Sequence, residues 1–160
     1  MIITSSRKPS QKTRTFCKNL SHALGHNYIN RGKMSFRELR LKGLEENELT
    51  LAIIYEMKGN PSRISFFSVK GKIKLELNIS VSITKNRLNI KTKELKIKID
   101  KKGLEFISDI LDVENDQNPH NNYIHITDYT KNNSMALIEF YNNTRNKTDL
   151  KIAIKSLKKY

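Results

Sequence analysis

The sequence predicts an α/β (α+β) fold with mixed sheets, and two patterns carry that prediction. A short apolar strand, a polar loop and an amphipathic helix follow one another twice before residue 45. From residue 49 onward, apolar strands alternate with short polar turns, interrupted by one further helical pattern. Repeated strand-loop-helix units place strands in parallel, whereas short turns join antiparallel strands, so both kinds of pairing are expected.

The first strand-loop-helix unit begins at the N-terminus. Ile2 and Ile3 start a short buried strand, and after a polar loop the apolar residues between Phe16 and Leu24 recur at helical spacing. Gly25 is the predicted end of that helix, because glycine readily adopts the left-handed backbone that closes a helix.

A second unit of the same kind follows. Residues 27–30 form its short strand, and Ser35 and Glu38 match a capping box that opens a helix running to about Leu44. The next segment, 49–57, is almost continuously apolar, so it is expected to be a central strand covered on both faces.

The remaining elements are expected to be mostly antiparallel strands with one helix. Predicted turns fall at residues 60–62 and 70–72. The predicted helix is 103–111, and the predicted strands are 64–69, 73–83, 88–99, 123–129, 135–141 and 150–157.

Positive charge dominates the composition. Thirty Lys and Arg residues oppose sixteen Asp and Glu residues, which gives a net charge of +14 and a pI near 9.9. This balance favours a polyanion such as RNA or DNA, with an anionic membrane surface as the other possibility. Residues 1–43 contain ten basic residues and one acidic residue, whereas residues 103–149 contain three basic and eight acidic residues. The N-terminal segment is therefore expected to face the partner.

Several other classes of protein are disfavoured. No stretch approaches the ~20 apolar residues of a membrane span, and the apolar N-terminus is too short for a signal peptide, so a soluble cytoplasmic protein without membrane contact is expected. The one cysteine, Cys17, cannot form an internal disulfide and is expected to be a core residue. A chain of 160 residues is expected to form one globular unit.

Two basic polar loops, residues 4–10 and 30–35, form the candidate site. Each lies between a strand and a helix, where backbone N–H groups, hydroxyl donors and positive charge converge on an anion. If both strands are parallel, the loops lie at the same carboxyl edge of a sheet and can hold one polyanion together. The candidate RNA-binding residues are Ser5, Ser6, Arg7, Lys8, Ser10, Thr13, Arg14, Asn30, Arg31, Gly32, Lys33 and Ser35.

Neither an enzyme nor a metalloprotein is indicated. Gly32-Lys33 lacks the upstream glycine and the following Ser or Thr of a P-loop, and no Gly-x-Gly-x-x-Gly occurs. His22 and His26 have the spacing of a helical metal pair, but Gly25 should end the helix between them. No catalytic residue, metal, cofactor or small-molecule substrate is therefore predicted.

Recognition of base edges is not favoured either. The chain has no Trp, and most of its six Phe and six Tyr residues occupy positions expected to be buried. The expected contacts are therefore to phosphate and 2′-hydroxyl groups.

The two loops resemble the opening motifs of Brix-domain proteins. Residues 3–10 with Thr13 and Arg14, followed by residues 28–35, are most similar to the small archaeal ribosome-biogenesis type, which is related to the U3 small nucleolar ribonucleoprotein Brix family. The resemblance implies a single Brix domain over residues 1–160, with approximate halves 1–85 and 86–160. Each half is then expected to resemble the anticodon-binding domain of class IIa aminoacyl-tRNA synthetases.

The resemblance also implies a function. A Brix-domain protein is expected to be an RNA-binding factor in rRNA processing and ribosome assembly rather than an enzyme. Here it would grip the backbone of rRNA or pre-rRNA through the two loops, with other assembly proteins as further partners. The alternative is a protein-binding scaffold within the pre-ribosome assembly machinery. A hydrolase acting on nucleotides or RNA would require catalytic residues that the sequence does not offer.

Overall fold

Nine strands form one mixed sheet in the computed structural model, which describes all 160 residues. Their order across the sheet is β2-β1-β3-β4-β5-β9-β8-β7-β6. The strands are β1 Ile2–Ser5, β2 Asn27–Tyr28, β3 Thr50–Met57, β4 Asn60–Ser68, β5 Ile73–Ser82, β6 Lys96–Ile99, β7 Tyr123–Asp128, β8 Ala136–Tyr141 and β9 Lys147–Lys159. The helices are α1 Gln11–Leu24, α2 Phe36–Glu45 and α3 Phe106–Leu111, with 3₁₀ turns η1 Thr92–Glu94 and η2 Lys131–Asn133. The predicted mixed α+β architecture is confirmed.

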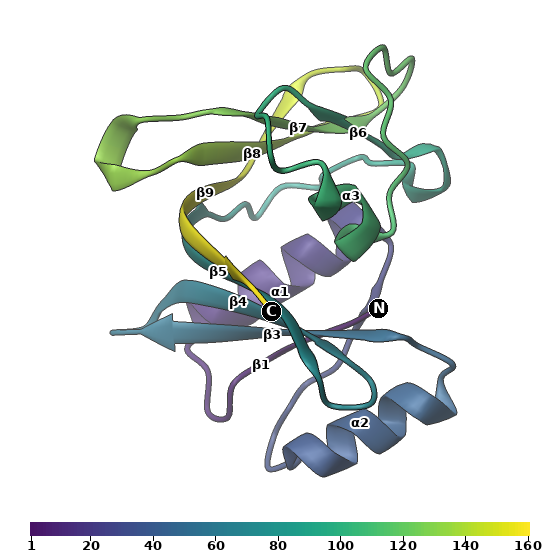
Figure 1. Cartoon of the computed structure of the whole chain (residues 1–160), viewed down its shortest axis with the longest axis vertical. Coiled ribbons are helices and arrows are strands. Elements are labelled where there is room, and N and C mark those ends of the chain that lie inside the picture. The colour runs from purple at the N-terminus through teal and green to yellow at the C-terminus, as the bar shows by residue number, and fades with distance from the viewer.

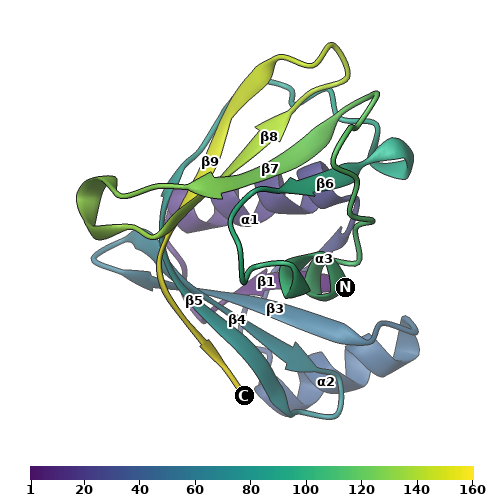
Figure 2. The ribbon, with the colours of Figure 1, turned by 45° about the horizontal axis from the view of Figure 1, so that its top comes forward.

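Helix α1 lies in the hollow of the curved sheet, and α3 lies near it (Figure 2). Ser10 caps the start of α1 by accepting a hydrogen bond from the Thr13 N–H. Gly25, with φ 69°, closes the end of α1 as predicted. Phe16 and Leu20 belong to a core of 30 buried residues drawn from α1, α3 and strands of both halves of the sheet. One core therefore joins the two ends of the sheet. No helix is both long and apolar enough to cross a bilayer.

Helix α2 covers the opposite face of β1 and β3 (Figure 1). Its buried Leu39 packs against Ile2, Leu51 and Ile53. The alternate residues of β3 point into the α1 core, so β3 is covered on both faces, as its continuous apolar run predicted.

The strand pairings at one end of the sheet recur at the other. β1 pairs in parallel with β3, which continues antiparallel to β4 and then β5. β6 pairs in parallel with β7, which continues antiparallel to β8 and then β9. An antiparallel pair of β5 and β9 joins the two sets. The boundary predicted near residue 85 falls in the irregular connection between β5 and β6.

The turn predicted at residues 60–62 is wrong. Lys58 and Gly59 make the turn instead, with φ of 50° and 77°, and β4 already begins at Asn60. Two consecutive left-handed residues match the twist of a tight hairpin. Pro61 is accommodated at the start of the strand, opposite Glu56, where the register shifts at a bulge.

Two elements of the second half are shorter than predicted. Residues 88–95 are not strand: residues 92–94 form the turn η1, and the Asn122 side chain bonds the backbone N–H and C=O of Lys91 at 2.6 and 3.1 Å, where a strand partner would otherwise bond. The helix predicted over 103–111 begins only at Phe106, because Gly103 has a φ of 86°, outside the helical region.

Candidate nucleic-acid interface

The two basic loops lie beside each other at the carboxyl ends of β1 and β2, which pair in parallel. One side-chain hydrogen bond ties the first loop to the residue just before the second, and another joins the two loops directly. The Thr4 hydroxyl donates to the Ile29 carbonyl at 2.6 Å, and the Arg31 guanidinium donates to the Ser5 carbonyl at 3.4 Å. Residues 4–10, the first loop, and residues 30–35, the second loop, are therefore held side by side.

Arg31 holds the two loops together from the inside. It is only 8% exposed, and its Nε–H donates to the Met34 carbonyl at 2.7 Å. Burial lowers the pKa of its guanidinium, Tyr55 raises it by a smaller amount, and the nearby charge of Arg7 lowers it further. Arg31 was predicted to contact phosphate, but its guanidinium is largely used in hydrogen bonds to the loop backbone.

A carboxylate occupies the N-terminus of α1. Glu56, at the end of β3, accepts hydrogen bonds from the Thr13 hydroxyl at 2.5 Å and from the Ser10 N–H at 2.9 Å. The Ser10 hydroxyl in turn donates to the Gly59 carbonyl at 2.8 Å, and Thr13 is fully buried. Glu56 therefore stands where the sequence predicted an external anion.

Sequence reasoning did not single out Glu56. Its partner Ser10 lies 46 residues away in the chain, so no local motif connects them. The available signal was one acidic residue near the end of an otherwise apolar strand.

The N-terminus of α2 is capped within its own first turn. The Glu38 N–H donates to the Ser35 hydroxyl at 3.1 Å, and the Ser35 N–H donates to the Glu38 carboxylate at 2.6 Å. These bonds to Ser35 lower the pKa of Glu38, and the nearby charge of Arg7 lowers it slightly further. The predicted capping box is confirmed, and it occupies the Ser35 side chain.

The remaining cations of the loops face solvent. Arg7, Lys8 and Lys33 are exposed, as is Arg14 just inside α1, whose guanidinium also donates to the Pro9 carbonyl at 2.9 Å. None of these four forms an ion pair with a carboxylate. Asn30 and Gly32 are also exposed, Ser6 is half-buried, and Ser5 is buried with its hydroxyl donating to the Ser6 carbonyl. The two loops and the first turn of α1 therefore present exposed cations without ion-pair partners.

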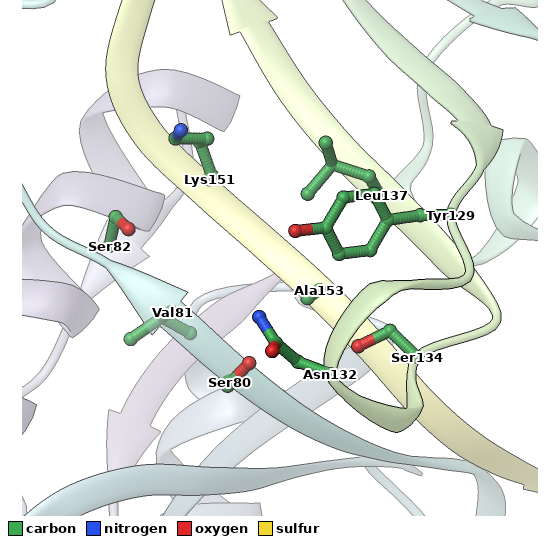
Figure 3. A pocket seen from close by; sticks show the side chains of 9 residues that line it. All are labelled: Ser80, Val81, Ser82, Tyr129, Asn132, Ser134, Leu137, Lys151 and Ala153. Carbon is green, nitrogen blue, oxygen red and sulfur yellow. The ribbon is translucent and has the colours of Figure 1, made fainter.

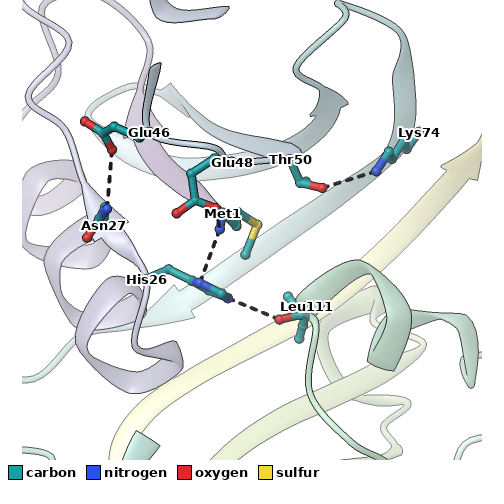
Figure 4. Close-up of polar contacts among 8 residues, drawn as sticks. All are labelled: Met1, His26, Asn27, Glu46, Glu48, Thr50, Lys74 and Leu111. Atoms are coloured by element: carbon teal, nitrogen blue, oxygen red, sulfur yellow. Dashed lines mark hydrogen bonds and ion pairs between the residues drawn. The ribbon is translucent and has the colours of Figure 1, made fainter. Parts of the chain in front are cut away.

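Cys17 and His26, the other side chains considered for chemistry, have structural roles. Burial raises the pKa of Cys17 to about 12, which leaves its thiol protonated and inert. His26 lies beyond the end of α1, where Nδ1 is 3.4 Å from the Met1 ammonium and Nε2 is 3.2 Å from the Leu111 carbonyl (Figure 4). The same ammonium pairs with Glu48. Burial lowers the pKa of His26, so its neutral ring serves as a link between the start of the chain and α3.

The Glu56 cap makes the stability of the fold depend on pH. Its folded pKa is lowered, chiefly by the Thr13 hydroxyl and then by the Ser10 N–H, so its contribution is present above the unfolded pKa of ~4.3 and is lost as pH falls through the folded value. Glu56→Gln is expected to cost about 1 kcal/mol of unfolding free energy at pH 7. Urea unfolding of both proteins from pH 7 to pH 3 should show this difference shrinking below about pH 4. A difference that is constant with pH would contradict the cap.

Curated archaeal proteins match part of the chain in sequence. A probable Brix domain-containing ribosomal biogenesis protein of Methanothermobacter thermautotrophicus is 48% identical over 71 residues, which is 44% of this chain and 43% of that protein. Proteins described in the same words from Methanosarcina mazei and Archaeoglobus fulgidus are 45% and 40% identical over 73 and 75 residues, or 46% and 47% of this chain and 45% of each relative. The matched stretch thus spans less than half the length of these relatives. No family model matches the chain.

Solved structures match over nearly the whole chain. Mil, an archaeal Imp4-like protein, has a TM-score of 0.85 at 26% identity and covers 100% of this chain and 99% of its own. A probable ribosomal biogenesis protein from Aeropyrum pernix K1 has a TM-score of 0.73 at 17% identity over 96% of this chain and 93% of its own, which supports the fold alone. The chain is therefore similar in sequence to archaeal Brix-domain proteins and has the fold of an Imp4-like protein, which confirms the resemblance seen in its two loops.

Proposed function

We propose that the protein is an RNA-binding ribosome-biogenesis factor that holds the backbone of rRNA or pre-rRNA through its two basic loops. The observation that carries this proposal is a set of exposed cations without ion-pair partners, namely Arg7, Lys8 and Lys33 on the joined loops and Arg14 in the first turn of α1. Similar archaeal proteins are described as ribosomal biogenesis proteins, and none of these names denotes an enzyme. We also propose that residues 1–160 act as one Brix domain with halves 1–85 and 86–160, each related to the anticodon-binding fold.

Side chains of the protein already cap the N-termini of α1 and α2, and this limits how the loops can hold RNA. Glu56 fills the N-terminus of α1 and the capping box fills that of α2. Phosphates are therefore held by the exposed side chains of the loops rather than by the first turns of the helices. Such contacts position a backbone and carry no base information, so recognition depends on the shape of the folded RNA.

Salt dependence tests this electrostatic mode of binding. If the four exposed cations neutralise about four phosphates, the logarithm of the association constant should fall against the logarithm of salt concentration with a slope of roughly −2.8 to −3.6. Fluorescence anisotropy with a structured rRNA fragment, measured from about 50 to about 300 mM salt, gives that slope. An RNA affinity that does not change over this range of salt concentration would exclude the electrostatic mode of binding.

A protein-binding scaffold is the second candidate function, and one observation favours it. Leu41, Leu44 and Leu49, on α2 and the segment after it, are 48%, 54% and 76% exposed. Contiguous exposed apolar patches are typical of partner surfaces, and Leu41 and Leu44 lie one turn apart on α2. Crosslinking in cells separates the two functions, since the first expects rRNA adducts at the basic loops and the second expects protein adducts at these leucines without rRNA adducts.

A further inference from the structure

A polar pocket lies on the face of the sheet opposite the α1 core, where the connection between β7 and β8 folds toward β5 and β9. Its volume is about 150 Å³. β5, β8 and β9 form its floor, and residues 129–134 of the connection form its wall (Figure 3). The lining residues are Ser80, Val81, Ser82, Tyr129, Asn132, Ser134, Leu137, Lys151 and Ala153.

Every polar side chain of this pocket can donate a hydrogen bond, and the Lys151 ammonium can only donate, whereas the hydroxyls and the Asn132 amide can also accept. Hydroxyl groups come from β5 and from the β7–β8 connection, an amide comes from Asn132, and an ammonium comes from Lys151 on β9. Figure 3 shows the Tyr129 hydroxyl and the Asn132 amide directed into the space between the connection and β5. No carboxylate lines the pocket. The lining therefore favours a ligand rich in acceptor oxygens and negative charge.

Lys151 has no ion-pair partner within the chain. Glu139 stands opposite Lys151 in the β8–β9 pair, but its carboxylate pairs with Lys147 at 2.9 Å. Lys151 itself is exposed and forms no ion pair. Its ammonium is therefore free to meet an anion in the pocket.

Ser134 adds a second independent sign of an unfilled site. Its hydroxyl oxygen is buried and makes no hydrogen bond within the chain. An unsatisfied buried polar group costs folding free energy. A ligand that supplies a partner there would recover part of that cost.

We propose that this pocket binds one phosphate group, held by the Lys151 ammonium and by the hydroxyl and amide donors around it. A cavity of about 150 Å³ can hold a molecule of the size of benzene, so a tetrahedral phosphate fits. The phosphate either belongs to an RNA backbone or is free inorganic phosphate, since both present the same oxygens. The inference does not depend on the basic loops, which follow β1 and β2 and are separated from β5 by β3 and β4 in the sheet.

Titration of the full chain with inorganic phosphate, without RNA, tests the site. We expect a saturable NMR shift of the Asn132 side-chain amide. Lys151→Gln should raise the dissociation constant about tenfold, or ~1.4 kcal/mol, because it removes one charge-assisted contact. Lys155→Gln, the matched control on β9 outside the pocket, should leave the constant unchanged. No saturable shift at Asn132, or the same constant in both variants, would overturn the proposal.

A second arm identifies the source of the phosphate once the site is established. If RNA supplies it, inorganic phosphate should compete with an rRNA fragment and Lys151→Gln should weaken RNA binding more than Lys155→Gln does. If the ligand is free phosphate, Lys151→Gln should weaken only phosphate binding. Both outcomes support the pocket, and neither depends on the result for loop variants.

Discussion

Replacing Arg7 and Lys33 together with glutamate is expected to weaken binding of a structured rRNA fragment about 100-fold at low salt. Both side chains are exposed and free of ion pairs, so reversal turns two attractions for phosphate into repulsions. A loss of roughly 1.4 kcal/mol at each position gives this factor. Fluorescence anisotropy at a single fixed salt concentration measures it.

The matched control changes the same number of charges elsewhere. Lys91 and Lys155 are exposed and lie in the β5–β6 connection and on β9, outside the two loops. Their double replacement by glutamate lowers the net charge equally, so its effect reports only diffuse attraction. Equal losses in the two double variants would mean that no localised site exists.

Arg31→Met is expected to lower the free energy of unfolding by about 3 kcal/mol. The change removes the donor for the Met34 and Ser5 carbonyls and leaves both poorly satisfied at the junction of the loops. Methionine keeps much of the length and apolar volume of the arginine stem, so the lost bonds dominate the effect. Urea unfolding at neutral pH measures the difference.

Lys33→Met is the control for this prediction, because Lys33 is an exposed neighbour on the same loop. It should change the unfolding free energy by no more than about 0.5 kcal/mol. A small effect at Arg31, or an equal one at Lys33, would show that Arg31 is not a structural link. Variants of Arg31 are therefore unsuitable as tests of RNA contact alone.

Features that depend on near neighbours could be predicted from the sequence. Gly25 ends α1, and Ser35 with Glu38 caps α2, as expected. Each of these signals uses backbone groups within four residues, so the local sequence contains the whole interaction. The apolar run of β3 similarly predicted burial on both faces.

Features that depend on distant partners could not be predicted in this way. The apolar pattern around Leu88 and Ile90 suggested a strand, but Asn122 holds the backbone of Lys91 from 31 residues away. The polar pocket likewise combines residues of β5, β9 and the β7–β8 connection, which no single stretch of sequence brings together.

The sequence by itself determined the family resemblance, the positive charge and the position of two basic loops between strands and helices. Only the tertiary structure decided which loop residues are free to bind. Glu56 reaches the N-terminus of α1 from β3, and Arg31 is buried between the loops, so Arg7, Lys8, Arg14 and Lys33 remain as the accessible charges. The reason is that burial and long-range hydrogen bonds depend on which strands pair, whereas caps and loops depend on neighbouring residues.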